Sequence, residues 1–321
     1  MITLYKEEDK KLISYADQMN IIERFENNMW MNMVDPTQEE LVKVSAKTGI
    51  ELDLLLPALD EEESARCEFD ESGTLLILDT PCIEIGANGK ENYSTIPFFI
   101  VYNSSYFITL CSEKTTLIDT TLQIIKKIEP HKHIRLALQL LYRLSSSYIT
   151  CLKKIDAQTK RMERVLHASQ KNKELFELME LNKTLVYFST SLSANKNVLV
   201  KLSRLPEYKK YEDDFELMED VLIENNQALE MCSIFRQILS AMAETFASVI
   251  SNNLNVVMKA LAIITIVLSI PTIIASFFGM NFQSIPLYNN PIGFYYAIII
   301  SVVLAAVGGA MLYFYSKKTK R

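Results

Sequence analysis

Apolar and polar residues alternate differently in three parts of the chain. In the first 130 residues, short runs rich in β-branched and aromatic residues are separated by turn formers, a pattern that predicts strands. The runs are residues 29–34, 74–80, 96–102 and 105–111. Residues 35–49 predict a helix with Asp35 as N-cap, Pro36 in its first turn and Gly49 at its end. We therefore expect residues 1–130 to form a compact α+β domain.

From His131 onward the apolar residues recur at helical spacing. Residues 141–162 and 175–202 carry leucines and aromatic residues at steps of three, four or seven, which predicts two long amphipathic helices packed as a hairpin. Residues 207–270 contain no Gly and no Pro, and Pro206 stands where a first-turn proline would. At 1.5 Å per residue, one helix over this range would be on the order of 100 Å long. The pattern indicates a stalk helix that continues into a membrane.

Two uncharged apolar runs follow, at about residues 260–278 and 292–315. Each has the roughly 20 residues that a helix needs to cross a bilayer. The predicted fold is thus predominantly helical. It has an α+β domain (1–130), long helices and a stalk (131–258), and a transmembrane hairpin with a basic tail (259–321).

Charge predicts how the hairpin is oriented. The amino terminus, MITLYKEEDKKL, is charged and so does not resemble a secretory signal. Lys259 begins the first apolar run, the basic tail KKTKR follows the second, and the loop between them has no Lys or Arg. Because positive residues stay on the cytoplasmic side, we expect a multi-pass protein of the inner or plasma membrane with both termini in the cytoplasm.

The acidic residues are all in the soluble part. Five of the 33 bases lie after residue 258: Lys259, Lys317, Lys318, Lys320 and Arg321. Residues 1–258 therefore hold 28 bases and all 39 acids, and 28 minus 39 gives these residues a formal charge of −11. An acidic body suits cations better than nucleic acid. Surface acids that only keep the domain soluble would give the same balance.

Nothing in the sequence indicates an enzyme or a bound cofactor. There is no phosphate-binding glycine loop, no GxSxG and no HExxH motif. His131 and His133 lack a nearby third ligand for a transition metal, so we expect surface residues at the start of a helix. The five cysteines are dispersed and odd in number, as expected for reduced, buried thiols of a cytoplasmic domain.

Polar and small residues form a single stripe along the first apolar run. The stripe consists of Asn255, Met258, Ala262, Thr265, Ser269, Thr272, Ser276 and Gly279, at alternating steps of three and four. Such a stripe either packs against other helices or lines a water-filled pore. One span cannot enclose a pore, so the second interpretation requires a homo-oligomer. The second run, with a serine and glycines as its few non-apolar residues, suits an outer position facing lipid.

Gly279-Met280-Asn281 directly follows the first of two carboxy-terminal spans, and here the chain resembles the CorA-type divalent cation transport proteins. The long preceding helix, NVVMKAL at its inner end, WMNMVDPTQEEL in the soluble domain and the basic tail extend the resemblance over essentially the whole chain. The resemblance implies a homopentameric channel for Mg²⁺ uptake, with Mg²⁺ as both transported and regulatory ion. Its partners would be its own copies, membrane lipid and divalent cations, with no nucleic acid.

The resemblance also implies roles for individual residues. The selectivity filter would be Gly279, Met280 and Asn281. The pore lining and gate would be Asn255, Met258, Leu261, Ser269, Thr272 and Ser276. Regulatory ligands would be Asp220 and Glu244; Pro57 replaces the usual partner of Asp220, and the nearest substitutes are Asp60 and Glu61. Phe278 replaces the usual tyrosine, and the loop lacks the acids that many members carry, which leaves ion recruitment to Gln283, Asn289 and backbone carbonyls.

Two other functions fit the same pattern. A relative of the same architecture could carry Co²⁺, Ni²⁺ or Zn²⁺, which a flux competition among metals would reveal. A membrane-anchored helical scaffold that passes no ion would use the stripe only for helix packing.

Overall fold

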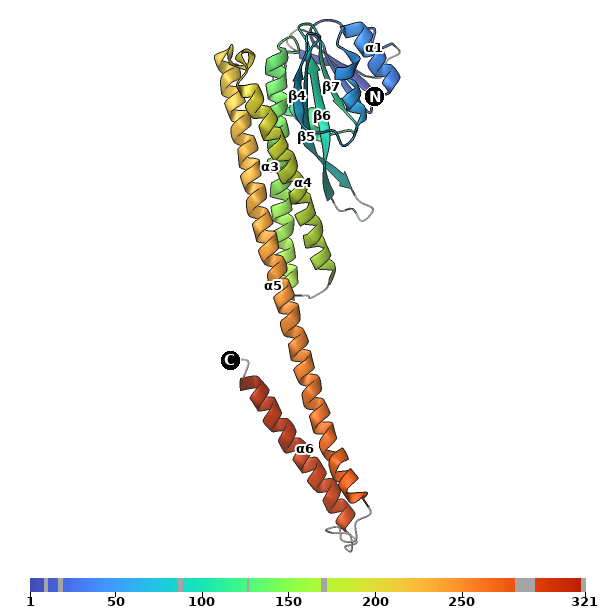
Figure 1. The fold of residues 1–321 in the computed structure, drawn as a ribbon, viewed down its shortest axis with the longest axis vertical. Helices are drawn as coiled ribbons and strands as arrows, with labels where there is room; N and C mark the ends of the chain where they lie inside the picture. The colour runs from blue at the N-terminus through green and yellow to red at the C-terminus, as the bar shows by residue number, and fades with distance from the viewer. Residues whose placement is uncertain are drawn as a thin grey trace. The chain divides into compact units, whose positions relative to one another are not determined.

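The computed structural model describes residues 1–8, 11–16, 20–85, 89, 91–125, 127–168, 172–280 and 292–318. The chain forms two compact units, a first unit, Met1–Ala243, and a second unit, Glu244–Arg321. The sheet and the helices α1 to α4 belong to the first unit, and helix α6 belongs to the second (Figure 1). Helix α5, Glu212–Phe278, contributes residues to both.

A seven-stranded sheet organises the first unit, in the order β2-β1-β3-β7-β6-β5-β4. The strands are β1 Ile2–Glu8, β2 Lys11–Ala16, β3 Trp30–Val34, β4 Arg66–Phe69, β5 Thr74–Ile85, β6 Glu91–Tyr102 and β7 Phe107–Cys111. Only β3 and β7 pair in parallel within these strands. The four runs predicted from β-branched and aromatic residues are confirmed as β3, β5, β6 and β7.

Helix α1, Gln38–Thr48, corrects the predicted cap. Its N-cap is Thr37, whose side chain accepts a hydrogen bond from the Glu40 N–H while the Glu40 side chain accepts one from the Thr37 N–H. Asp35, the predicted cap, lies two residues earlier with φ of 51°. A hydroxyl with a glutamate three residues later satisfies two free helix donors at once, which a lone carboxylate does not. Gly49 ends the helix in the left-handed conformation, as predicted.

Three further short helical elements lie between α1 and the long helices in chain order. They are η1 Leu52–Leu54, η2 Leu56–Leu59 and α2 Thr116–Ile124. The long helices α3, His133–Ala168, and α4, Asn172–Ser203, pack against β5 and β6 (Figure 1). The apolar stripes that predicted them supply their buried faces.

Buried polar groups fix these helices on the sheet at a defined position. Asp79 on β5 stands opposite Pro97 on β6, which has no N–H to donate. The fully buried side chain of Asn195 on α4 bonds both Asp79 backbone groups, accepting from its N–H at 2.9 Å and donating to its carbonyl at 2.8 Å. The Tyr148 hydroxyl on α3 donates to the same carbonyl at 3.0 Å. One strand position therefore binds both helices.

Helix α5 begins later than predicted and then continues without a break. Pro206 lies in a separate 3₁₀ helix, η3 Pro206–Lys209, and α5 starts at Glu212. The helix then runs through Pro271 to Phe278, the predicted end of the first span. Helix α6, Gly293–Lys318, covers the second span. The most apolar windows of α5 and α6 each have a mean hydropathy of 2.4, so both helices are long and apolar enough to cross a membrane.

Candidate functional site

The stripe on α5 is uncovered within its unit. Asn255, Met258, Leu261, Thr272 and Ser276 are exposed, and Ser269 is half-buried. Apolar side chains of the same segment, such as Ile264 and Leu268, are exposed as well, so what distinguishes the polar residues is their common stripe and not their exposure. The structure thus presents the predicted pore-lining set on one accessible face.

The hydroxyls of this stripe have a defined polarity. Thr265 donates to the Leu261 carbonyl at 2.9 Å, Ser269 to Ile266 at 2.8 Å and Thr272 to Leu268 at 3.1 Å. A hydroxyl has one proton and two lone pairs, so a hydroxyl that donates to its own helix keeps only acceptor capacity outward. The stripe can therefore accept hydrogen bonds from water or from a hydrated cation.

Helix α6 contacts a different face of α5. The half-buried residues there are Ile263, Val267, Ile270 and Ile274. At 3.6 residues per turn, this face lies about 160° around the helix from the polar stripe. A Cβ on Gly309 would stand 3.1 Å from Val267 Cγ2, and one on Gly308 would stand 3.2 Å from Ile270 Cδ1. The two glycines therefore permit close packing, and the stripe stays free.

Small residues on α6 form its side of this contact. The residues less exposed than their neighbours are Ala297, Ser301, Ala305, Gly308, Gly309 and Leu312. The Ser301 hydroxyl donates to the Ala297 carbonyl at 2.7 Å, so its polarity is satisfied within α6. Most large side chains of α6 point outward, as expected for a helix in lipid. The sequence showed these small residues, but their common face was not predicted.

The end of α5 leads into Gly279-Met280-Asn281. The Gly279 N–H donates to the Ala275 carbonyl at 3.0 Å, and the Met280 N–H to Phe277 at 3.3 Å, so helical bonding continues to the start of the motif. Gly279 has no positive φ. An added Cβ would stand 3.3 Å from the Ala275 oxygen, so space, not backbone conformation, favours glycine here. Met280 is exposed. Asn281, Gln283 and Asn289 lie outside the described residues.

The predicted regulatory acids lie in separate places. Asp220 is exposed on α5 and lines a recess of about 380 Å³ between α3 and α5. Glu61 lines a different recess of about 300 Å³ with Asp79, and Asp60 accepts a hydrogen bond from the Glu62 N–H at 2.9 Å. Glu244 is exposed at the start of the second unit. Within the part of the chain that the structure describes, no group of three or more His, Cys, Asp or Glu could hold a metal ion.

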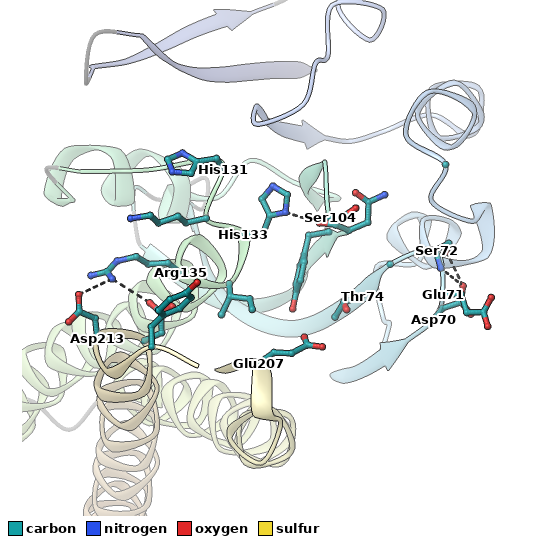
Figure 2. Close-up of a pocket in the computed structure, with 18 residues that line it drawn as sticks. Asp70, Glu71, Ser72, Thr74, Ser104, His131, His133, Arg135, Glu207 and Asp213 are labelled. Atoms are coloured by element: carbon teal, nitrogen blue, oxygen red, sulfur yellow. Dashed lines mark hydrogen bonds and ion pairs between the residues drawn. The ribbon is translucent and has the colours of Figure 1, made fainter. Parts of the chain in front are cut away.

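A recess of about 960 Å³ lies in the first unit where α3 begins (Figure 2). His133 is buried there, with Nδ1 2.7 Å from the Asn103 carbonyl oxygen, which corrects the predicted surface position. Burial lowers the pKa of His133, which keeps the ring neutral at pH 7. His131 is exposed, 3.7 Å from Glu7. The two histidines therefore have different partners.

Arg135 closes one side of this recess. Its guanidinium lies 3.2 Å from Asp213 and 3.4 Å from Asp214, the contacts drawn as dashed lines in Figure 2. Burial raises the pKa of Asp214, and Arg135 opposes that shift. Arg135 thus forms ion pairs with two acids at the start of α5.

The cysteines agree with their prediction. All five are free and buried. Burial raises the pKa of Cys111 and Cys151 to about 12 and that of Cys232 to about 11. Thiols with such values stay protonated and unreactive at neutral pH.

Comparisons with known proteins agree with this architecture. The family model described as CorA-like Mg²⁺ transporter protein matches residues 25–321. The cobalt/magnesium transport protein CorA of Methanocaldococcus jannaschii is 32% identical over 286 residues, which cover 87% of this chain and 88% of that protein.

Solved structures give the same result. The complete CorA magnesium transporter from Methanocaldococcus jannaschii matches with a TM-score of 0.80 and 28% identity, covering 97% of this chain and 96% of that one. The full-length CmaX protein matches with a TM-score of 0.70 at 17% identity, covering 100% of this chain and 98% of that one, a likeness in fold alone.

Proposed function

This chain belongs to the family of CorA-like Mg²⁺ transporter proteins, and on that premise we propose that it is a homopentameric channel for Mg²⁺ uptake. The observation that carries the proposal is the uncovered polar stripe on α5, opposite the face that packs on α6. Copies of α5 around a common axis would place their stripes inward and their α6 helices outward. Such a ring encloses an acceptor-lined path through the membrane.

The chemistry of this path suits a hydrated ion. Mg²⁺ binds its octahedral water shell tightly and gives it up reluctantly. The Thr265, Ser269 and Thr272 hydroxyls have outward lone pairs, so they accept hydrogen bonds from those waters. Neutral acceptors hold the ion without trapping it by charge. Inward flux needs no nucleotide, because the membrane potential supplies about 4.6 kcal/mol per 100 mV for a double charge.

The two ends of the path have different tasks. Asn281 amide oxygens, one from each copy, select the hydrated ion at the outer mouth, with Gly279 and Met280 supporting them. Met258 and Leu261, both exposed apolar side chains on α5, form a constriction that closes by dewetting. Cytoplasmic Mg²⁺ closes the channel by binding acids between neighbouring copies. Asp220 and Glu61 line different recesses of one chain, and Asp60 adjoins Glu61 in the sequence, as a shared site between copies would require.

Uptake into liposomes tests the pore and the filter together. Protein is reconstituted around a Mg²⁺-sensitive dye, an inside-negative potential is imposed, and wild type is compared with Asn281→Ala. We expect rapid uptake by wild type and at least a tenfold loss in the variant with assembly intact. Asn290→Ala, the same substitution later in the loop, is the control. Equal uptake by Asn281→Ala and wild type would contradict the filter, and absence of ion flux in wild type would favour a scaffold.

Co²⁺ is the second candidate ion. The relative at 32% identity is named as a cobalt/magnesium transport protein, and oxygen ligands alone discriminate weakly between such metals. Competition of Co²⁺, Ni²⁺ and Zn²⁺ against Mg²⁺ flux in the same liposomes orders the metals. Strong flux of another metal with no Mg²⁺ flux would replace Mg²⁺ as the transported ion.

A further inference from the structure

The recess between α3 and α5 in the first unit contains charged groups of both signs. It is lined by Arg135 and Arg143 from α3 and by Asp213, Glu216 and Asp220 from α5, with Tyr142 on its wall. Arg135 is already engaged by Asp213 and Asp214 (Figure 2). The cation left for the remaining acids of the recess is therefore Arg143.

Arg143 is held in the recess with part of its hydrogen-bonding capacity unused. Its guanidinium carbon lies 5.4 Å from the centre of the Tyr142 ring, a cation–π contact that places the head group. Its Nε is buried and has no hydrogen-bond partner within the described residues. An arginine remains charged at all relevant pH values, and a buried donor of a charged group without an acceptor is costly. Such an atom calls for a partner in another state of the protein.

Glu216 and Asp220 are the two acids lining the recess that form no ion pair with Arg135. They are four residues apart on α5, so they lie on one helix face, and like charges at this spacing repel each other. Both are exposed, and neither forms an ion pair with a residue that the structure describes. The recess therefore contains an arginine whose Nε has no acceptor and two carboxylates without an ion pair among the described residues.

We infer that Arg143 competes with cytoplasmic Mg²⁺ for Asp220 and so sets the Mg²⁺ concentration at which the channel closes. This inference rests on the function proposed above. When Mg²⁺ is scarce, the Arg143 guanidinium turns to Asp220 and Glu216 and neutralises their repulsion. When Mg²⁺ is abundant, the ion takes Asp220, and Arg143 returns to the position over Tyr142. Arg143 is thus a positioning residue that never binds the ion.

The test is Arg143→Gln in the full-length protein, with two readouts. Liposome flux gives the internal Mg²⁺ concentration at half-closure, and protection from limited proteolysis by Mg²⁺ reports binding without transport. We expect both midpoints to fall about two- to fivefold, the range of an exposed ion pair that is lost. Arg143→Lys keeps the charge and should restore most of the wild-type midpoint. Arg161→Gln is the matched control, because Arg161 is exposed on the same helix and does not line the recess.

Asp220→Asn separates this inference from the proposed function. If Asp220→Asn leaves the Mg²⁺ response unchanged, the regulatory role of Asp220 fails and the role of Arg143 fails with it. If Asp220→Asn weakens the response but Arg143→Gln leaves both midpoints unchanged or raises them, only the inference about Arg143 is overturned. A fall with Arg143→Gln that disappears in the Asp220→Asn background supports it, because coupled residues are non-additive.

Discussion

The two units of this chain treat apolar side chains in opposite ways. In the first unit, Phe99 on β6 and Trp30 on β3 are fully buried, and the fully buried side chain of Asn195 has hydrogen-bond partners on β5. In the second unit, large apolar residues such as Leu268 and Phe314 are among the most exposed, at 65% and 67%. Burial from water drives the first arrangement. The second is the arrangement expected of helices in a membrane, where apolar side chains face lipid.

The largest effect should come from the core of the first unit. Phe99→Ala removes a fully buried ring and should lower the free energy of unfolding of this unit by about 3–5 kcal/mol. Trp30 is the chain's only tryptophan and lies in the same unit, so its fluorescence during denaturation reports the loss. Phe314→Ala, at an exposed phenylalanine of α6, should leave the denaturation midpoint of the first unit unchanged. Equal shifts in the two variants would contradict the contrast between the units.

Replacing an exposed valine by lysine should show whether water or lipid surrounds that position. Val303 on α6 and Val42 on α1 are similarly exposed, at 53% and 47%. Val303→Lys should oppose membrane insertion by about 2.5–3.5 kcal/mol, the cost of a lysine at the centre of a membrane helix. Val42→Lys should change stability by no more than about 0.5 kcal/mol. Insertion is measured by the side of the membrane on which a carboxy-terminal tag is accessible. Correct insertion of Val303→Lys would show that this face of α6 is in contact with water.

The contact between α5 and α6 should respond to size rather than to polarity. Gly309→Leu places side-chain atoms where a Cβ already stands 3.1 Å from Val267, so it should destabilise the second unit by about 1–3 kcal/mol. Ala310→Leu, at the exposed next position, is the control. Heat denaturation in detergent, followed by loss of helical circular dichroism, compares them. If Ala310→Leu proves the more harmful, α6 packs on α5 through a different face.

The smallest effect concerns pH and two carboxylates of the first unit, Asp79 and Asp70. Burial raises the pKa of Asp79, against a smaller opposing effect of the Ser191 hydroxyl. A raised carboxyl pKa means that the charged form costs the folded state stability at neutral pH, and that this cost disappears as the pH falls towards the ordinary value of about 4. Asp79→Asn should therefore raise the denaturation midpoint, followed by Trp30 fluorescence, at pH 7. The increase should be smaller than the decrease caused by Phe99→Ala, and it should be smaller still at pH 4.

Asp70 provides the control of opposite sign. Hydrogen bonds from the Ser72 N–H at 3.1 Å and the Ser72 hydroxyl at 2.9 Å lower the pKa of Asp70. Its contribution to stability is present above the unfolded pKa and is lost as the pH falls through the folded value. Asp70→Asn should thus be slightly destabilising at pH 7 and neutral in acid. The same sign of change for both variants would contradict burial as the cause at Asp79.

Prediction from sequence succeeded where a signal is local and strong. The strands β3, β5, β6 and β7 and the end of α5 at Phe278 were found because each has its own apolar pattern. Strands β1, β2 and β4 were missed; β1, with the sequence ITLYKEE, and β4, with RCEF, are half charged. The place of β1 in the sheet comes from its pairing with β3, and that of β4 from its pairing with β5. A local sequence pattern does not contain such pairing.

The site divides in the same way. The polar stripe on α5 follows from spacing alone, since any helix of 3.6 residues per turn puts those positions on one face. The burial of His133 and the unsatisfied Nε of Arg143 could not be inferred, because each depends on neighbours from other elements. A lone histidine at a helix start and a single arginine in an amphipathic helix have no sequence signal that distinguishes a buried position from a solvated one.

What the sequence determined by itself is therefore the long helices, four of the strands, the two apolar spans and the existence of the stripe, because periodicity and apolarity are properties of consecutive residues. What only the tertiary structure decided is which face of α5 is covered and which recess each acid lines. Gly308 and Gly309 favour the approach of α6 to the apolar face, because a Cβ at either position would stand 3.1–3.2 Å from the Val267 or Ile270 side chain. The stripe is free because the opposite face has a partner, and that is a fact of packing between residues distant in the chain.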